Sequence, residues 1–321
     1  MQNVKSSGVQ ENVPLSKYTT FRIGGEAKFF CFAKTDEELK GALEFAAKNN
    51  LKQFILGGGS NLLVSDKGFD GLVIKYAISG TKYLGNETVE ANAGTFLASL
   101  ITEAIRDDLK GLEWAAGIPG TVGGAISNNS GAYRSAMSDF LIDLEVLEKD
   151  EKSGSWKEKK MKKEDCAYEY RNSIFKCNKK YIILKAKFRL EKGNAEESKK
   201  LVLEHIGDRA KKQPLTFPNA GCIFKNPVVD EKYMEKALKE YPELETIAKG
   251  NCIPVWWFIN TLKLSGKKIG GVEISPKHGN FLINSANGKA EDVVILISLI
   301  KQKVRDNFGV QLHEEIEYVG F

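Results

Sequence analysis

One short stretch, residues 219–227, combines residue types that suit acid chemistry on an anionic ligand. Gly221 frees the backbone, and Cys222 directly after it carries a transferable proton. Lys225 and Asn226 follow, a cation and an amide that suit phosphate and carbonyl oxygens. The stretch therefore predicts a site where an anionic substrate is held beside an acid. The alternative is a polar loop between two strands.

Two glycine-rich segments have the composition of nucleotide-binding loops. Residues 57–62 follow a short apolar strand expected at residues 54–56, and residues 117–125 combine a Pro-Gly pair with two adjacent glycines. Glycines allow tight turns whose amides approach a ligand closely, a geometry that suits a pyrophosphate. The two loops could clamp one dinucleotide from both sides, although structural turns would also explain either one.

Neither segment fits the Rossmann fingerprint, which needs G-x-G-x-x-G between a strand and a helix. Residues 57–61 lack that spacing, and apolar residues 62–64 follow them instead of an amphipathic helix. Pro119 interrupts the second segment, and the paired glycines Gly123 and Gly124 are expected in a tight turn. The pattern therefore favours a nucleotide-binding architecture of another type.

The composition is that of an ordinary soluble protein. The chain has 321 residues, an apolar fraction of 42%, a charged fraction of 28% and a formal net charge of +5. This length favours two domains. The mild positive charge helps to attract an anionic nucleotide but is far from that of a nucleic-acid-binding protein, so no nucleic-acid partner is expected.

The cysteines and histidines predict neither disulfides nor a metal site. The five cysteines are odd in number and have no close pair, and the three histidines are scattered. The first residues do not resemble a signal peptide, and no apolar run is long enough to cross a membrane. We therefore expect free thiols, a cytoplasmic location and no membrane insertion.

Helical and strand patterns alternate along the chain. A capping box formed by Thr35 and Glu38 opens the first helix, and Gly309 ends the last one. The Lys- and Glu-rich residues 148–165 favour a solvated hairpin tip over a nucleic-acid patch. We place a domain boundary after residue 194, where a helix begins. Helices are expected at residues 35–50, 96–108, 193–212, 232–240, 255–264 and 290–307. Strands are expected at residues 54–56, 72–74, 89–93, from 142, at 181–190 and at 311–319.

Taken together and in order, these segments resemble the UDP-N-acetylenolpyruvoylglucosamine reductase (MurB) family over nearly the whole chain. No single segment is specific, but the ordered set is. The segments that carry the resemblance are residues 18–25, 57–63, 117–125, 131–133, 170–176, 213–215, 220–227, 270–284 and 312–320.

The resemblance implies an α+β chain with an FAD-binding domain of the vanillyl-alcohol-oxidase (PCMH) type, residues 1–194. A smaller α+β substrate-binding domain, residues 195–321, follows it. It implies non-covalent FAD, NADPH as co-substrate, and a UDP-sugar enolpyruvyl substrate. The implied reaction reduces UDP-N-acetylglucosamine enolpyruvate to UDP-N-acetylmuramate in peptidoglycan precursor synthesis. Hydride reaches C3 of the enolpyruvyl group, and a protein acid protonates C2.

The resemblance also assigns roles to residues. Arg171 pairs with the substrate carboxylate, Cys222 donates the proton, and Glu315 assists enol formation through a hydrogen bond. The substrate is further bound by Tyr133, Lys225 and Asn226. The cofactor is bound by Gly57, Gly58, Gly59, Ser60, Asn61, Leu62, Gly117, Ile118, Pro119, Gly120, Gly123, Gly124 and Ala125. Each catalytic residue also has a structural alternative. Arg171 could be a surface arginine at a strand end, Glu315 an exposed carboxylate on the terminal strand, and Cys222 a small buried residue at a turn.

The chain departs from the family pattern at three positions. Cys222 stands where relatives more often have Ser, and since a thiol is the stronger acid, the proton-transfer role survives. Glu317 stands where Arg is common, which puts any cationic substrate contact there in doubt, and Ser130 stands where Ala is usual. The chain has no room between Arg171 and Cys222 for an additional substrate-covering loop, so it resembles the loop-less (type II) form.

Two other functions remain open from the sequence. A related FAD oxidoreductase that uses oxygen would share the glycine loops, but would not need Lys225 and Asn226 for a diphosphate. A nucleotide-binding regulatory protein without turnover would not need Arg171, Cys222 and Glu315 together.

Overall fold

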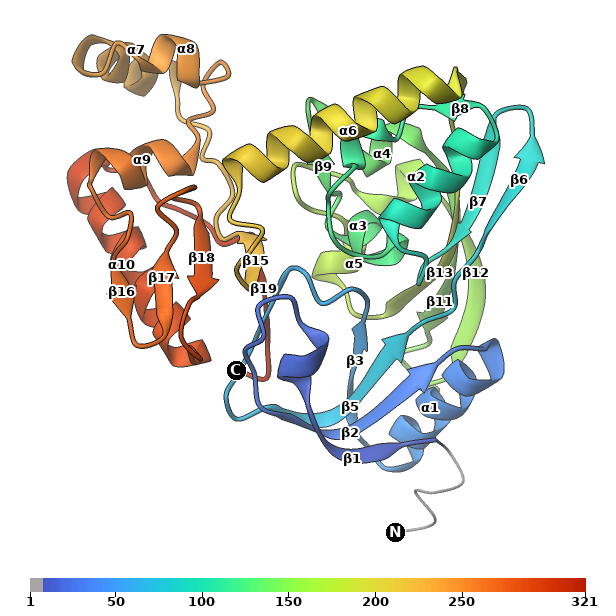
Figure 1. The fold of residues 1–321 in the computed structure, drawn as a ribbon. Coiled ribbons are helices and arrows are strands. Elements are labelled where there is room, and N and C mark those ends of the chain that lie inside the picture. Colours follow the sequence, from blue (N-terminus) through green and yellow to red (C-terminus); the bar gives the residue numbers. More distant parts are fainter. Residues whose placement is uncertain (1–7) are drawn as a thin grey trace. The chain divides into compact units, whose positions relative to one another are not determined.

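The computed structural model describes residues 8–321, which form two compact units, each with its own hydrophobic core (Figure 1). The first unit comprises residues 8–13, 27–59 and 69–211, and the second comprises residues 14–26, 60–68 and 212–321. The chain thus passes repeatedly between the units. The domain boundary after residue 194 stays a prediction.

A four-stranded sheet opens the first unit. Its order is β1-β2-β5-β3, and β5 pairs in parallel with both β2 and β3. Helix α1 (Asp36–Lys48) covers one face, where its buried residues join those of β2 and β5 in one core. Thr35 Oγ1 accepts the Glu38 N–H at 3.2 Å, which confirms one half of the predicted capping box. The Glu38 carboxylate accepts the N–H of Lys34 at 2.6 Å and not that of Thr35. The strands are β1 (Gln10–Pro14), β2 (Glu26–Ala33), β3 (Lys52–Leu56) and β5 (Phe69–Tyr76).

A five-stranded antiparallel sheet forms the other half of the first unit. Its order is β12-β11-β13-β7-β6, with α2 and α3 packed in the same core. Two short strand pairs, β8 with β14 and β9 with β10, lie outside it. The strands are β6 (Thr81–Gly85), β7 (Thr88–Asn92), β8 (Leu109–Lys110), β9 (Gly131–Ala132), β10 (Ser135–Ala136), β11 (Leu141–Lys149), β12 (Trp156–Lys162), β13 (Tyr181–Arg189) and β14 (Glu191–Lys192). The helices are α2 (Leu97–Arg106), η3 (Glu113–Ala115), α3 (Val122–Ser127), α4 (Met137–Phe140), η4 (Lys163–Cys166), α5 (Ile174–Cys177) and α6 (Ala195–Lys212).

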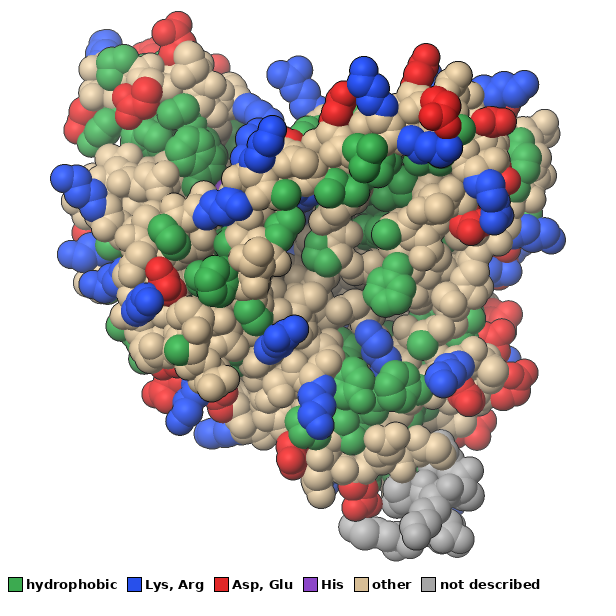
Figure 2. All heavy atoms as spheres, in the orientation of Figure 1, with side chains coloured by type: hydrophobic (Ala, Val, Ile, Leu, Met, Phe, Trp, Pro, Cys, Tyr) green, Lys and Arg blue, Asp and Glu red, His purple; other side chains and the backbone are tan. Residues whose placement is uncertain are grey.

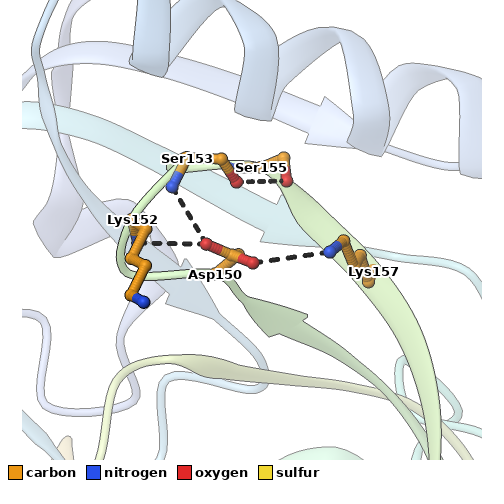
Figure 3. A network of polar contacts seen from close by, with 5 residues as sticks. All are labelled: Asp150, Lys152, Ser153, Ser155 and Lys157. Carbon is orange, nitrogen blue, oxygen red and sulfur yellow. Dashed lines mark hydrogen bonds and ion pairs between the residues drawn. The ribbon is translucent and has the colours of Figure 1, made fainter.

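The predicted solvated hairpin tip is confirmed between β11 and β12. The carboxylate of Asp150 accepts the backbone N–H groups of Lys152 and Ser153 at 3.0 and 2.9 Å (Figure 3). Lys157 Nζ lies 3.4 Å from the same carboxylate, and the hydroxyls of Ser153 and Ser155 share a hydrogen bond. These bonds, those to Ser153 first, lower the pKa of Asp150 to about 2.

The second unit is built on the antiparallel sheet β15-β18-β17-β16 and the long helix α10 (Ala290–Phe308). One stripe of α10 is buried in the core, and Gly309, at φ 68°, ends the helix as predicted. The other elements are η2 (Leu15–Tyr18), β4 (Leu62–Val64), β15 (Asn219–Cys222), α7 (Glu231–Glu240), α8 (Leu244–Ile247), α9 (Val255–Thr261), β16 (Lys268–Ile269), β17 (Val272–Ile274), β18 (Phe281–Asn284) and β19 (Glu317–Val319).

The prediction of one continuous strand at residues 311–319 is wrong in extent, because this segment changes partner along its length. Residues 313–315 bond to residues 223–225, whereas β19 pairs in parallel with β4. The exchange of partners interrupts the regular ladder, and only residues 317–319 form a strand.

The prediction of a tight turn at Gly123 and Gly124 is also wrong, since both lie in the first turn of α3. Thr121 caps this helix by accepting the Gly124 N–H at 3.5 Å. A β-carbon added to Gly123 would lie 2.8 Å from the Ala93 β-carbon. Glycine therefore allows α3 to pack closely against the end of β7, and this tertiary contact outweighs its low helix propensity.

Candidate active site

The two glycine loops meet within the first unit. A β-carbon added to Gly58 would lie 2.6 Å from the Gly120 α-carbon, and one added to Gly57 would lie 2.7 Å from Thr121 Oγ1. Gly58 therefore packs against backbone and Gly57 against the Thr121 side chain, at distances that leave no room for a β-carbon. Gly117 and Gly120 adopt positive φ values of 75° and 129°.

Gly124 differs from these glycines because it has room around it. The nearest atom to an added β-carbon is Thr121 Oγ1, at an ordinary 3.6 Å. In the loop that ends in α3, the backbone at Gly124 thus has open space beside it, whereas the backbone at Gly120 and Gly123 is closely packed. Such a surface fits a ligand that approaches the main chain, as the pyrophosphate of a dinucleotide does. Ala125, in contrast, is buried in the core and contributes packing.

Lys75 is a cation at the first loop that was not predicted from the sequence. Its Nζ donates a hydrogen bond to the Gly57 carbonyl oxygen, and burial lowers its pKa. The available signal was a lysine directly after the apolar run of residues 72–74 in β5. Thr121, which contacts Gly57 and caps α3, was missed as well.

The rest of the first loop, Ser60 to Leu62, belongs to the second unit. There the Asn61 side-chain amide donates to the Glu315 carbonyl oxygen at 3.2 Å, and the Glu317 N–H donates to the Asn61 carbonyl oxygen at 2.9 Å. Leu62 pairs with Glu317 in the β4–β19 ladder. These bonds tie the predicted cofactor loop to the backbone of the predicted catalytic Glu315.

Cys222 follows a bulge in β15. Gly221 adopts φ 79°, and its N–H donates to the Asn219 side-chain oxygen at 2.9 Å. The register against β18 shifts between Asn219, which pairs with Ile283, and Cys222, which pairs with Phe281. A bulge changes the direction of the side chains beside it, so the Cys222 side chain is oriented differently from its direction in a regular strand.

Cys222 and Glu315 are brought to neighbouring backbone positions by hydrogen bonds on both sides of one segment. On one side, the Glu315 N–H donates to the Ile223 carbonyl oxygen at 2.7 Å. On the other, the buried Asn280 side chain accepts the Phe224 N–H at 3.0 Å and donates to its carbonyl oxygen at 2.8 Å. Asn280 was missed from the sequence, since only its pairing with a distant segment reveals its role.

Lys225 and Asn226 continue the same segment. The Lys225 N–H donates to the His313 carbonyl oxygen at 2.9 Å. The Asn226 side-chain oxygen accepts the Val255 N–H at 3.0 Å, at the beginning of α9. Asn226 therefore has its amide N–H groups, not its oxygen, to offer a ligand.

Arg171 lies in a turn of the first unit with φ 55°. Its guanidinium donates to the carbonyl oxygens of Asn129 at 3.4 Å and Gly131 at 2.5 Å, and lies 5.3 Å from the Tyr170 ring centroid. These contacts hold the group in place. Of the three predicted catalytic residues, the second unit thus brings two together, and Arg171 belongs to the first.

Tyr133 occupies the two-residue turn between β9 and β10, also in the first unit. Its ring stacks on His205, with centroids 4.1 Å apart, and its hydroxyl donates to Asp208 at 2.9 Å. Burial, and next the bond to Asp208, raise the pKa of Tyr133.

An apolar pocket of about 710 Å³ lies between α2 and α6, with Ala116 and Gly117 in its lining. Figure 2 shows hydrophobic side chains over these helices with lysines and arginines around them. Its lining contains none of the predicted catalytic or substrate-binding residues.

Within residues 8–321, no cluster of three or more metal-ligating side chains occurs. Among the same residues, no helix has the length and apolar character needed to cross a membrane.

Comparison with known proteins gives two family matches. Residues 27–153 match an FAD binding domain, and residues 213–319 match the UDP-N-acetylenolpyruvoylglucosamine reductase C-terminal domain. These matches, with the mixed elements of both units, confirm the predicted fold class: α+β, with an FAD-binding domain of the PCMH type followed by a smaller domain.

Similar proteins cover almost the whole chain. A UDP-N-acetylenolpyruvoylglucosamine reductase of Carboxydothermus hydrogenoformans is 37% identical over 98% of this chain and 95% of its own length. One from Clostridium novyi is 35% identical over 97% and 92%. The crystal structure of the Thermus caldophilus enzyme (MurB) superposes with a TM-score of 0.72 at 29% identity, covering 96% of this chain and 98% of that one.

Proposed function

The chain belongs to the UDP-N-acetylenolpyruvoylglucosamine reductase family, an FAD-containing group of oxidoreductases, and from this premise we propose its reaction and its catalytic residues. The proposed reaction reduces UDP-N-acetylglucosamine enolpyruvate to UDP-N-acetylmuramate at the expense of NADPH. It serves peptidoglycan precursor synthesis in the cytoplasm. The observation that carries the proposal is the hydrogen-bonded adjacency of the Cys222 and Glu315 segments.

The two glycine loops and Lys75 are the residues that would hold FAD. The fit is supported by the close backbone approach of Gly58 to Gly120 and by the open space at Gly124. When bound, FAD supplies a ring that accepts a hydride from NADPH and passes one to the substrate. We propose residues 1–194 as the domain that binds it and residues 195–321 as the substrate-binding domain.

Arg171 binds the substrate carboxylate in this proposal. Two carbonyl oxygens hold its guanidinium, and the planar fork of N–H donors in this group matches the geometry of a carboxylate. A fixed cation stabilises the negative charge that develops when hydride adds to C3 of the enolpyruvyl double bond. No rearrangement is then needed during the reaction.

Cys222 supplies the proton that completes the reduction. Hydride adds to C3, the electron pair of the double bond takes the thiol proton at C2, and solvent reprotonates the thiolate. Glu315 assists by a hydrogen bond to the enol-like group. The bulge before Cys222 and the bond between Glu315 and Ile223 support this pairing of roles.

Lys225, Asn226 and Tyr133 bind the sugar nucleotide. Lys225 contributes a positive charge, and Asn226 contributes amide donors because its oxygen is occupied at α9. Both lie on the segment that carries Cys222, so binding and proton donation depend on one stretch of backbone.

The test is an anaerobic steady-state assay with the purified holoenzyme. NADPH oxidation should require the enolpyruvyl sugar nucleotide, and mass spectrometry should find a product heavier by two hydrogens. NADPH oxidation that proceeds only with oxygen, with the sugar nucleotide unchanged, would instead identify an oxidase.

A further inference from the structure

Tyr133 is held in an unfavourable backbone conformation. It and Arg134 form the turn that joins β9 to β10, with φ values of 51° and 69°. Positive φ in a residue other than glycine is unfavourable and persists only where the surroundings enforce it. The support for this turn comes from α6.

Three residues on one face of α6 contact the Tyr133 side chain. The His205 ring stacks on the Tyr133 ring at an interplanar angle of 22°, and the Asp208 carboxylate accepts a hydrogen bond from the Tyr133 hydroxyl. The Arg209 guanidinium lies 5.8 Å from the Tyr133 ring centroid. Spacings of three and four residues put these groups on one side of a helix. Arg209 also reaches the second glycine loop, since its Cδ would lie 3.0 Å from a β-carbon added to Gly117.

His205 is itself fixed. Its Nδ1 lies 2.9 Å from the Glu113 carbonyl oxygen, and because a carbonyl can only accept, Nδ1 carries the proton. The buried Glu113 carboxylate accepts the Gly111 N–H at 2.7 Å and the Ser198 hydroxyl at 2.5 Å. This network joins α6 to η3, so the face of α6 that supports Tyr133 is rigid.

We propose that His205 and Asp208 are positioning residues for the Tyr133 phenol. They hold it so that its hydroxyl donates a hydrogen bond to Asp208. The phenol oxygen then offers lone pairs to an N–H or O–H group of the sugar nucleotide, not a proton to its diphosphate. The ligand in this inference rests on the proposed function. A diphosphate at neutral pH is an acceptor without a proton to donate, and the Asp208 carboxylate beside the hydroxyl would repel it.

The first test is a double-mutant cycle in the FAD-loaded enzyme, with UDP-N-acetylmuramate titrated calorimetrically into the oxidised protein. Asp208→Ala should weaken binding about tenfold, the worth of one oriented hydrogen bond. The same change in a Tyr133→Phe background should add no further loss. Asp208→Asn, whose oxygen still accepts the hydroxyl, should retain most of the affinity.

Matched variants test the stacking and exclude a general effect on α6. His205→Phe keeps an aromatic ring and should bind better than His205→Ala. Glu204→Ala, an exposed carboxylate on the same helix, should behave as the parent, and all variants should keep their FAD. Tighter binding by Asp208→Ala would mean that Tyr133 donates to the diphosphate, and equal losses in both backgrounds would mean that Asp208 acts elsewhere. Either result overturns the proposal.

A ligand-free measurement separates this proposal from the proposed function. The ionisation of Tyr133, isolated as the ultraviolet difference between the parent and Tyr133→Phe, should occur at lower pH in Asp208→Ala. An unchanged titration overturns the positioning by Asp208 whatever the protein binds. If the titration shifts but the parent does not bind UDP-N-acetylmuramate, the proposed function fails, and with it the ligand assigned to Tyr133.

Discussion

At the residue scale, a small set of hydrogen bonds positions Cys222. Asn219 and Gly221 shape the bulge before it, and Asn280 and Glu315 hold the backbone directly after it. A proton donor must be held within hydrogen-bond reach of the atom it protonates, and these bonds limit its movement. In the proposed role as proton donor, the thiol therefore acts from a preorganised position.

Replacing the thiol by a hydroxyl tests what the cysteine adds. Cys222→Ser should keep much of the activity, because the hydroxyl occupies the same place. It should lose the sensitivity to hydrogen peroxide that an accessible thiol confers. Residual activity after graded peroxide exposure measures this. Cys177→Ser, which removes an exposed thiol elsewhere, should remain as sensitive as the parent.

Lys225 should contribute binding and little chemistry. Lys225→Ala should raise the KM for the sugar nucleotide roughly ten- to a hundredfold, the loss of one charge-assisted hydrogen bond. Its kcat should change little, since a cation on the diphosphate serves ground and transition state alike. Lys232→Ala, on the exposed surface of α7, is the control. An unchanged KM in Lys225→Ala would remove Lys225 from the binding site.

From the sequence, single residues could be proposed for the site where the side-chain type itself suggests a chemical role. They could not be proposed where the role depends on contacts with distant backbone. Cys222 and Lys225 could be selected because an acid and a cation lie close together in the sequence. Asn280 acts on Phe224 across 56 positions, and Lys75 acts on Gly57 through the geometry of a parallel sheet. Neither contact leaves a local pattern.

At the element scale, we propose that the second glycine loop and α3 bind the cofactor together. Gly124→Ala should fold normally, because the protein leaves space there and alanine favours a helix. It should nevertheless lose FAD affinity if the pyrophosphate approaches this backbone. The flavin-to-protein absorbance ratio after dialysis measures the loss. Gly207→Ala, equally open within α6, is the control. Full flavin content in Gly124→Ala would place the pyrophosphate elsewhere.

The β11–β12 hairpin tip should become less stable in acid. The folded-state pKa of Asp150 is lowered to about 2, so its contribution is complete above the unfolded-state value and is lost as the pH falls toward about 2. The stability difference between the parent and Asp150→Ala in urea unfolding should therefore be constant near neutral pH and shrink in acid. A difference that grows in acid would contradict the assigned bonds.

Helices and strands could be predicted where the hydrophobic pattern or a capping signal is clear in the sequence. They could not be predicted where contacts with distant segments determine the backbone conformation. The stripe of α10 and the capped start of α1 were read from local pattern. Helix α3 was not predicted because its two glycines have low helix propensity. Its close packing against Ala93 favours the helix in the folded protein. The last strand was overextended because residues 313–319 pair with two different segments.

At the scale of the whole molecule, the chain does not complete one unit before it begins the other. Residues 14–26 and 60–68 contribute Phe21, Ile23 and Leu63 to the second core. No change in composition marks these crossings, so they could not be predicted from the sequence. Gly59 and Ser60 fall on different sides of this division, and so the predicted cofactor loop belongs to both units.

The central claim is that Cys222 serves only the second of two half-reactions. Stopped-flow spectroscopy under anaerobic conditions measures each separately, as the loss of flavin absorbance with NADPH and its return with the enolpyruvyl sugar nucleotide. Cys222→Ala should lose absorbance at nearly the parental rate. Its recovery should be slower by a factor on the order of 100 or more, the contribution of a general acid. If Cys222→Ala recovers as fast as the parent, the cysteine is a structural turn residue and the proton comes from another group.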